Sequence, residues 1–229
     1  MIAISREVRE HLILDFRLDG KKITVINNGI DTKNFGDFSA REKMRKDLGI
    51  NDAPLVGIIA RLSDVKGHIY LIRAMQKVVK NFAPAKLLII GRGRMKDALI
   101  EEAGNLGLKD NVLFIPEARG SEDLLAAMDI FVMPSLQEGL GLALMEAMAQ
   151  GLAVIGSRVG GIKTLIQDEV NGLLVKPADA EGLTAAIIRL LGDCDLRRNL
   201  GVNARKFIVD NFSKEKMVDL TEKFYNSFL

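Results

Sequence analysis

Two glutamates, Glu138 and Glu146, enclose seven residues in a stretch that combines a glycine turn with an apolar helix, residues 134–161. Glu138 precedes Gly139 and Gly141 in the turn, and Glu146 lies one to two turns into the helix expected after it. A helix that opens at a glycine turn presents free backbone N–H groups and the positive end of its dipole, which favour an anion such as a diphosphate. With two carboxylates around the same cleft, the site suits a ligand that is part phosphate and part polyhydroxyl.

The side chains of a helix lean towards its N-terminus, so we expect Glu146 to reach the opening that Glu138 lines. Its neighbours Leu142, Met145 and Met148 leave it little polar face, and a buried carboxylate needs a partner. The plainer interpretation remains open, because glycine turns precede helices in many α/β proteins and a glutamate in a helix usually faces water.

A second group of residues follows two apolar runs earlier in the chain. Arg61 and Lys66 lie in the loop after the run 55–60, and Gly91 and Gly93 follow the next run. Arginine can fork onto two phosphate oxygens and lysine acts as a point charge, a pair that suits a diphosphate leaving group. The alternative interpretation is that Arg61 and Lys66 are ordinary surface cations and that the two glycines form a plain loop.

The elements that must position these residues are six apolar runs separated by amphipathic helices. Their hydrophobicity is continuous rather than alternating, which predicts parallel strands buried on both faces. With right-handed crossovers this gives an α/β fold, a Rossmann-like doubly wound parallel sheet of about six strands with helices on both faces. Ligands of such sheets bind beyond the carboxyl ends of the strands. The runs are 55–60, 87–90, 112–115, 130–133, 153–155 and 173–175.

Helix signals frame this pattern. Ser5 is the expected N-cap of a first helix, and Ser39 with Glu42 forms a capping box for a helix that stops at Gly49. We expect His68, next to a glycine, to be a surface residue at the start of a helix rather than a base. Three amphipathic helices, in residues 183–191, 196–210 and 213–228, are expected to cover the sheet.

The composition is that of a soluble globular protein, with 229 residues, 48% hydrophobic and 27% charged. A net charge of +2 and an aromatic content of 5% argue against a nucleic-acid partner. The single cysteine, Cys194, excludes an internal disulfide and fits a reducing compartment. The sequence contains neither a run of transmembrane length nor a signal-peptide pattern, so we expect a protein of the cytoplasm, or one peripheral at the membrane.

Taken in order, the motifs resemble the C-terminal, donor-binding domain of family-4 retaining glycosyltransferases of the GT-B fold, the group that includes glycogen, sucrose and lipopolysaccharide synthases. Glu138 and Glu146 match the E-x7-E signature of that family. The other matching stretches are 23–35 (ITVINNGIDTKNF), 60–67 (ARLSDVKG), 87–93 (LLIIGRG), 127–146, Gly160 with Gly161, and 171–177 (NGLLVKP).

The resemblance implies transfer of a sugar from a nucleoside diphosphate sugar to an acceptor hydroxyl, with retention at the anomeric carbon. It assigns Arg61 and Lys66 to the diphosphate, and Glu138 to hydroxyls of the donor sugar. It assigns Glu146 to the ribose. The backbone from Gly139 through Leu140 and Gly141 to Leu142 would face the sugar and phosphates, and Gly91 and Gly93 would form the loop on the nucleotide side.

Three departures from the family pattern stand out. Thr164 occupies the last position of a Gly-Gly-x-Pro-Glu motif, so the expected acid is missing. Leu140 replaces a frequent phenylalanine, and Pro116 stands where the family usually has glycine. No Cys/His cluster or Asp-x-Asp pair in the sequence suggests a bound metal, so we expect no metal and no cofactor apart from the donor substrate.

The resemblance also divides the chain. Residues 1–35 correspond to the end of a preceding domain and the interdomain linker, and residues 36–229 to the nucleotide-sugar domain. The expected partners are a nucleotide sugar and, through a missing N-terminal domain, an acceptor sugar or lipid-linked sugar. We expect this chain alone to transfer no sugar, and to self-associate through Leu62, Leu140 and Leu142 if the interdomain face exposes them.

Two other classes of function remain open. The first is a nucleotide-sugar-binding module without catalysis. The second is an isomerase related to the nucleotide-sugar 2-epimerases, which needs acid and base groups facing the sugar. The sequence shows no histidine or additional carboxylate placed for that role. A transferase assay and a donor-binding assay on one sample distinguish the three.

Overall fold

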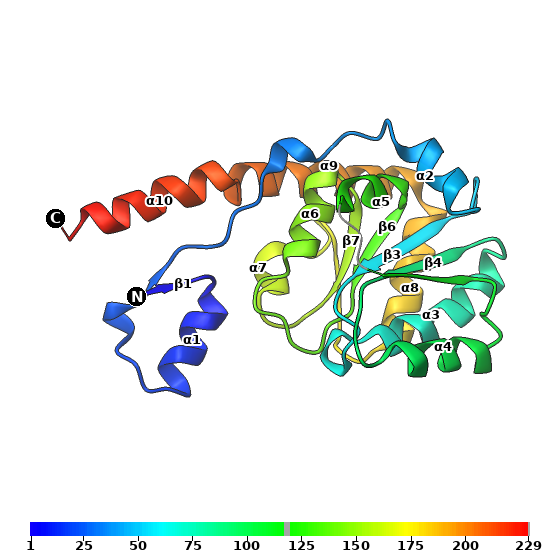
Figure 1. Cartoon of the computed structure of the whole chain (residues 1–229), viewed down its shortest axis with the longest axis horizontal. Helices are drawn as coiled ribbons and strands as arrows, with labels where there is room; N and C mark the ends of the chain where they lie inside the picture. Colours follow the sequence, from blue (N-terminus) through cyan, green and yellow to red (C-terminus); the bar gives the residue numbers. More distant parts are fainter. Residues whose placement is uncertain (117–119, 229) are drawn as a thin grey trace.

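The computed structural model describes residues 1–116 and 120–228, and its centre is a parallel sheet of six strands in the order β5-β4-β3-β6-β7-β8 (Figure 1). This confirms the predicted doubly wound sheet, because all six apolar runs form strands. The strands are β3 (Leu55–Ile59), β4 (Lys86–Ile90), β5 (Val112–Ile115), β6 (Ile130–Met133), β7 (Ala153–Ser157) and β8 (Leu173–Val175).

The order of the strands reverses between β3 and β6. From β3 the chain first extends the sheet through β4 to β5, then returns to the other side of β3 and continues through β6 to β8. The two central strands pair in parallel, with Val56 opposite Ile130 and Gly57 opposite Phe131. Loops that leave these two strands diverge to opposite faces of the sheet, so a crevice forms at their carboxyl ends.

Alternate strand residues feed two separate cores, one on each face of the sheet. Leu55 and Phe131 pack into one core, and Val56 and Ile130 into the other. The first core is covered by α2 (Arg41–Asp47), α5 (Ser121–Ala127), α6 (Leu142–Gln150), α7 (Ile162–Leu165) and α9 (Cys194–Asn211). The second is covered by α3 (His68–Asn81), α4 (Lys96–Asn105) and α8 (Ala180–Gly192), which lie together on the other side of the sheet in Figure 1.

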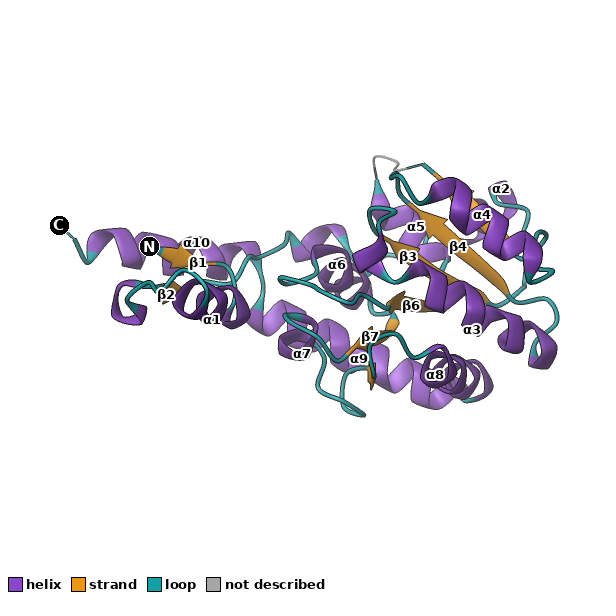
Figure 2. Ribbon diagram, turned by 90° about the horizontal axis from the view of Figure 1, so that it is seen from below, coloured by secondary structure: helices purple, strands orange, loops and turns teal. Residues whose placement is uncertain are grey.

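The first 25 residues and the last helix lie at one end of the molecule, away from the six-stranded sheet (Figures 1 and 2). There β1 (Ile2–Ala3) pairs in parallel with β2 (Thr24–Val25), and α1 (Arg6–Leu14) connects them through the short η1 turn (Gly20–Lys22). The helix α10 (Lys214–Asn226) extends towards the same end, and Figure 1 shows it apart from the first 25 residues. Two backbone hydrogen bonds of Ile30, to Phe212 O and from Lys214 N, join the stretch before the η2 turn (Thr32–Asn34) to the start of α10.

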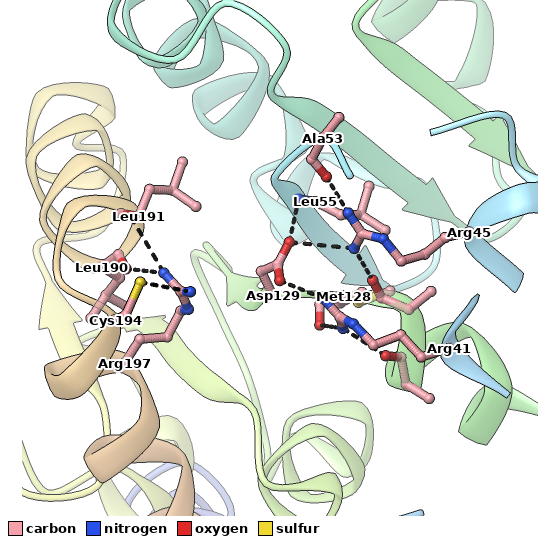
Figure 3. A network of polar contacts seen from close by, with 12 residues as sticks. Arg41, Arg45, Ala53, Leu55, Met128, Asp129, Leu190, Leu191, Cys194 and Arg197 are labelled. Carbon is pink, nitrogen blue, oxygen red and sulfur yellow. Dashed lines mark hydrogen bonds and ion pairs between the residues drawn. The ribbon is translucent and has the colours of Figure 1, made fainter. Parts of the chain in front are cut away.

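At the amino ends of the central strands, three arginines are fixed to backbone carbonyls (Figure 3). Arg41 donates to Asp129 Oδ1 at 2.6 Å, and the buried Arg45 donates to Ala127 O at 2.7 Å. Asp129 also accepts from the backbone N–H of Leu55 at 2.8 Å. Arg197 holds the C-terminal end of α8 through Leu190 O at 2.7 Å. The polar groups of Arg41 and Arg45 are occupied by the protein itself, so this network stabilises the end of the sheet opposite the crevice.

Of the two helix caps predicted from the sequence, one is confirmed and the other is wrong. Ser5 caps α1 as predicted, because its side chain accepts a hydrogen bond from Val8 N at 3.2 Å. The capping box at Ser39 was wrong, since α2 begins at Arg41 after Ala40, which provides no side-chain cap. The Ser39 hydroxyl instead donates to Asp37 Oδ2 at 2.8 Å.

Candidate functional site

The loops that follow β3 and β6 meet directly at the crevice. The first contains the short η3 turn (Asp64–Lys66), and the backbone N–H of Leu136 in the second donates to Val65 O at 2.7 Å. Gly67, with φ of +68°, ends the turn and opens α3. A Cβ at this glycine would overlap the carbonyl oxygen of Pro134, so the close approach of the two loops requires a glycine there.

This approach brings Lys66 and Glu138 together. Lys66 Nζ donates to Glu138 Oε2 at 2.6 Å, and Ser135 Oγ approaches the same oxygen at 3.4 Å. The lysine and glutamate side chains are only 18% and 11% exposed, so the pair is largely withdrawn from solvent. An ion pair at this depth fixes the orientation of both side chains more firmly than a surface pair does.

An open pocket of about 530 Å³ lies around the pair. Arg61 lines it from the end of β3, and Glu7, Val8 and His11 line it from α1. Arg61 is exposed and makes no ion pair in the part of the chain that the structure describes. The remaining lining residues are Val65, Lys66, Leu136, Gln137, Glu138, Gly139, Val159 and Gly160.

The glycine turn after β6 leads into α6 at the edge of this pocket. Gly141, with φ of +91°, is the N-cap of α6 and provides no side chain, so the first N–H groups of the helix have no side-chain acceptor there. Gly139 is exposed, and a Cβ built on it would meet no atom within 4 Å. Its lack of a side chain therefore serves neither packing nor a strained backbone, which suits close approach of a ligand.

The Gly160–Gly161 pair holds the turn from the side of β7. A Cβ on either glycine would overlap the backbone of the turn, at Glu138 for the first and Gly139 for the second. The N–H of Gly161 donates to Glu138 O at 3.0 Å. This motif therefore fixes the main chain of Glu138 while Lys66 fixes its side chain.

Gly91 and Gly93 serve the loop after β3 rather than the pocket at Glu138. A Cβ on Gly91 would overlap Ala60 O, and one on Gly93 would overlap Leu62 O. Leu62 N also donates to Arg92 O at 2.9 Å. In the described chain Gly93 lines a separate pocket on the other side of Arg61, so the loop after β4 supports the backbone that carries this arginine.

Glu146 contacts Ser121, whereas Glu138 contacts Lys66. Ser121 Oγ, at the start of α5, donates to Glu146 Oε2 at 3.2 Å. Burial raises the pKa of Glu146, the serine hydrogen bond opposes this, and the nearby charge of Glu122 adds to it. The expected partner of a buried carboxylate is thus present. Glu146 is not among the described residues that line the pocket at Glu138.

The structure corrects two predictions of exposure. Leu62 and Leu140 are 2% and 3% exposed, so they belong to the core, and only Leu142 is open, at 48%. His68 does begin α3 as expected, but it is buried rather than on the surface. Burial, with a smaller effect of the Lys66 charge, lowers the pKa of His68 to about 4. Pro116, which stands where the family usually has glycine, is followed by residues 117–119, which lie outside the described residues.

The contribution of α1 was missed from the sequence. Ser5 Oγ donates to Gly139 O at 3.0 Å, and Thr164 Oγ1 donates to Glu7 Oε1 at 2.9 Å. These bonds fix the first turn of α1 against the glycine turn, so Glu7 and His11 reach the pocket. The sequence argument that no histidine or additional carboxylate faces the site was therefore wrong. No local motif marks this contact, because 134 residues separate Ser5 from Gly139.

Together, the strand order and the pocket define a Rossmann-like domain of the GT-B type with its binding crevice at the switch point. The chain belongs to the family described as glycosyl transferases group 1, whose sequence model matches residues 40–207. This confirms the resemblance of its motifs to GT-B glycosyltransferases.

Two relatives illustrate the membership. The chain is 33% identical over 231 residues to an uncharacterized glycosyltransferase, MJ1607, of Methanocaldococcus jannaschii, covering 98% of this chain and 59% of the relative. It is 30% identical over 230 residues to the UDP-Gal:alpha-D-GlcNAc-diphosphoundecaprenol alpha-1,3-galactosyltransferase of Escherichia coli, with the same coverage of 98% and 59%. The chain thus spans less than two thirds of the length of these relatives.

Solved structures show the same architecture. The structure of Anabaena Alr3699/HepE in complex with UDP matches with a TM-score of 0.93 at 25% identity, over 99% of this chain and 63% of that one. Sucrose-phosphate synthase from Thermosynechococcus elongatus matches with a TM-score of 0.86 at 28% identity, over 99% of this chain and 57% of that one. Among the helices that the structure describes, none has the length and apolar character that crossing a bilayer requires.

Proposed function

We propose that this chain is the donor-binding part of a glycosyltransferase, and that it holds a nucleoside diphosphate sugar in the pocket at the switch point. The observation that carries the proposal is the largely buried ion pair between Lys66 and Glu138. It is set beside the open end of α6 and beside Arg61, which has no ion-pair partner among the residues that the structure describes. A ligand that joins a diphosphate to a polyhydroxyl ring needs cations, N–H groups and a carboxylate in one place. HepE, whose solved structures include complexes with UDP and with UDP-glucose, supports the proposal by its similarity.

The role of each residue follows from its surroundings. Arg61 and Lys66 would neutralise the diphosphate as it departs, one as a planar fork and the other as a point charge. Glu138, whose side chain is fixed by Lys66, would accept hydrogen bonds from hydroxyls of the donor sugar. The backbone at 139–142 would face the sugar and phosphates, and Glu146 the ribose, as a carboxylate does in dinucleotide-binding folds.

The proposed reaction transfers the sugar to an acceptor hydroxyl with retention at the anomeric carbon. Its transition state combines an oxocarbenium-like sugar with a departing diphosphate, and fixed cations placed before the reaction stabilise the latter without reorganisation. We propose that these cations act without a metal ion. The acceptor, a sugar or lipid-linked sugar, would bind mainly to the part of the longer relatives that this chain does not span.

One observation favours a second candidate, an isomerase of the nucleotide-sugar 2-epimerase kind. Glu7 and His11 line the same pocket as Lys66 and Glu138, so a carboxylate and an imidazole are present beside the proposed site of the sugar. Incubation of the protein with UDP-N-acetylglucosamine, followed by NMR of the sugar protons, distinguishes the candidates. A new epimer at the sugar C2 identifies an isomerase, whereas an unchanged sugar with measurable binding supports the donor-binding function.

Calorimetry tests the proposal directly, with UDP and GDP titrated in the presence and absence of EDTA. We expect binding in the micromolar to millimolar range, unchanged by EDTA, because one wall of the cleft is open. Arg61→Ala should weaken the affinity about tenfold, a loss of about 1.4 kcal/mol. The matched control is Arg198→Ala, an exposed arginine on α9 whose partner is Asp195. Absence of heat with both nucleotides up to millimolar concentration would contradict the proposal.

A further inference from the structure

Glu7 is a carboxylate that the family resemblance did not assign, and it lines the same pocket as Lys66 and Glu138. It lies in the first turn of α1, in the segment that precedes the sheet domain. Two hydrogen bonds between that segment and the site, from Ser5 to Gly139 and from Thr164 to Glu7, fix its position. The side chain is therefore part of a built wall of the pocket rather than a free surface group.

Only one of the two oxygens of Glu7 is satisfied by the protein. Oε1 accepts the hydroxyl of Thr164 at 2.9 Å, whereas Oε2 is shielded from solvent and has no donor among the residues that the structure describes. A shielded carboxylate oxygen without a donor is costly, so such an atom in a binding pocket indicates a donor that arrives with a ligand.

Thr164 relates Glu7 to the acid that is missing from the motif after Gly161. It stands at the position where the motif after Gly161 was expected to carry an acid. Here the acid comes from α1 instead, since Glu7 reaches across and Thr164 holds it by one oxygen. A carboxylate is thus present near the glycine turn, although it belongs to a different element from the one that the sequence pattern indicates.

On this basis, and resting on the proposed function, we propose that Glu7 is a specificity-determining residue that accepts a hydrogen bond from a hydroxyl of the donor sugar. Thr164 keeps Oε1, and a small turn of the carboxyl group about its soft terminal torsion presents Oε2 to the pocket. Glu138 and Glu7 then contact the sugar from two sides. Bare UDP or GDP has no sugar beyond the diphosphate, so it makes no contact with Glu7.

The test compares a nucleotide with its sugar conjugate on each variant. Calorimetry would measure dissociation constants of UDP against UDP-glucose and of GDP against GDP-mannose, for the wild type, Glu7→Ala and Glu7→Gln. The matched control is Glu10→Ala, an exposed glutamate on the same helix. For the conjugate that the wild type binds more tightly, Glu7→Ala should weaken binding at least fivefold, while the bare nucleotide stays within twofold. Glu7→Gln keeps an acceptor for Thr164, so it preserves the fold and should give a smaller loss.

The outcomes separate this inference from the proposed function. If the wild type binds neither nucleotide nor conjugate, the proposed function fails and the role of Glu7 fails with it. If the wild type binds and Glu7→Ala weakens UDP and UDP-glucose equally, or weakens neither, the role of Glu7 is refuted while the proposed function stands. Selective loss of the conjugate in both Glu7 variants, with none in Glu10→Ala, supports the inference.

Discussion

Lys66 and Glu138, 72 residues apart in the sequence, form a 2.6 Å ion pair that joins the loops of two adjacent strands. Its position at the point where the strand order reverses follows from the topology, since β3 and β6 are neighbours only because the chain returns to the centre of the sheet. A diphosphate that binds here would share Lys66 with Glu138, so the lysine is oriented before the ligand arrives. The first two predictions separate the roles of the two glutamates.

Replacing Glu138 should affect only the sugar end of the ligand. Glu138→Ala removes the acceptor for sugar hydroxyls and also frees Lys66. The lysine loses its fixed orientation but gains an uncompensated charge, and these effects act on the diphosphate in opposite directions, so the affinity for bare UDP should stay within about twofold. The affinity for UDP-glucose should fall about tenfold, as expected for the loss of a charge-assisted hydrogen bond. Paired calorimetric titrations measure this, and an equal loss for UDP and UDP-glucose would show that Glu138 does not contact the sugar.

Replacing Glu146 should have two opposite effects. Glu146→Ala removes the proposed ribose contact and Glu146→Gln replaces the charged acceptor by a neutral one, so both should weaken bare UDP, the alanine variant more. The pKa of Glu146 is raised above its ordinary value, so its contribution to stability is present below the unfolded pKa and is lost as the pH rises through the folded pKa. Glu146→Gln should therefore increase the free energy of unfolding at pH 7 relative to the wild type. Urea unfolding beside calorimetry checks both effects, and stronger UDP binding by Glu146→Gln would refute the ribose role.

Three glycines should respond differently to alanine. Gly160→Ala forces a Cβ into the carbonyl of Glu138 at a φ of +39°, so it should destabilise the fold by about 2 kcal/mol or more and disturb the site. Gly104→Ala, in open space on α4, should stabilise by about 0.5–1 kcal/mol. Gly139→Ala, also in open space, should leave the free energy of unfolding nearly unchanged but weaken UDP-glucose. Urea unfolding and calorimetry would test this set, and unchanged binding in Gly139→Ala would argue against a ligand at that turn.

The buried His68 should make stability depend on pH. Its pKa falls from 6.5 to about 4 on folding, so between these values the unfolded chain binds more protons and stability is lost as the pH falls. Lowering the pH from 7 to 5 should cost the wild type about 2 kcal/mol more than His68→Leu. Urea unfolding of both proteins at each pH measures the difference. Replacement of the exposed His11 provides the control. If the stability of the wild type and of His68→Leu had the same pH dependence, the burial of a neutral imidazole would be contradicted.

The sequence predicted the sheet well because each strand is a continuous apolar run between strong turn signals, and such a run indicates a strand buried on both faces. It also predicted that Lys66 and Glu138 would lie at the carboxyl ends of strands. It failed where the outcome depends on tertiary contacts. The burial of Leu62 and Leu140 follows from the packing of loops against the core, and no local pattern distinguishes a loop leucine that packs from one that faces water.

For the site, too, the sequence predicted the local features and missed those that depend on tertiary contacts. Gly139 and Gly141 were recognised as a turn before a helix, and Gly160 and Gly161 from the family resemblance, but their separate tasks became clear only from what a Cβ would meet. The spacing of Glu138 and Glu146 indicated one opening, whereas the structure pairs the first with Lys66 and the second with Ser121. Glu7 and Thr164 came together through the docking of α1, a contact between segments 157 residues apart that no motif records.

The central claim is that a nucleoside diphosphate binds at the switch point between β3 and β6. Amide NMR of the labelled chain, titrated with UDP, tests it most directly because it reports where the ligand binds. We predict progressive shifts in the loops at 61–67 and 138–142, with Arg41, Arg45 and Asp129 at the opposite end of the sheet unaffected. Shifts confined to that opposite end, or none anywhere at millimolar UDP, would contradict the account.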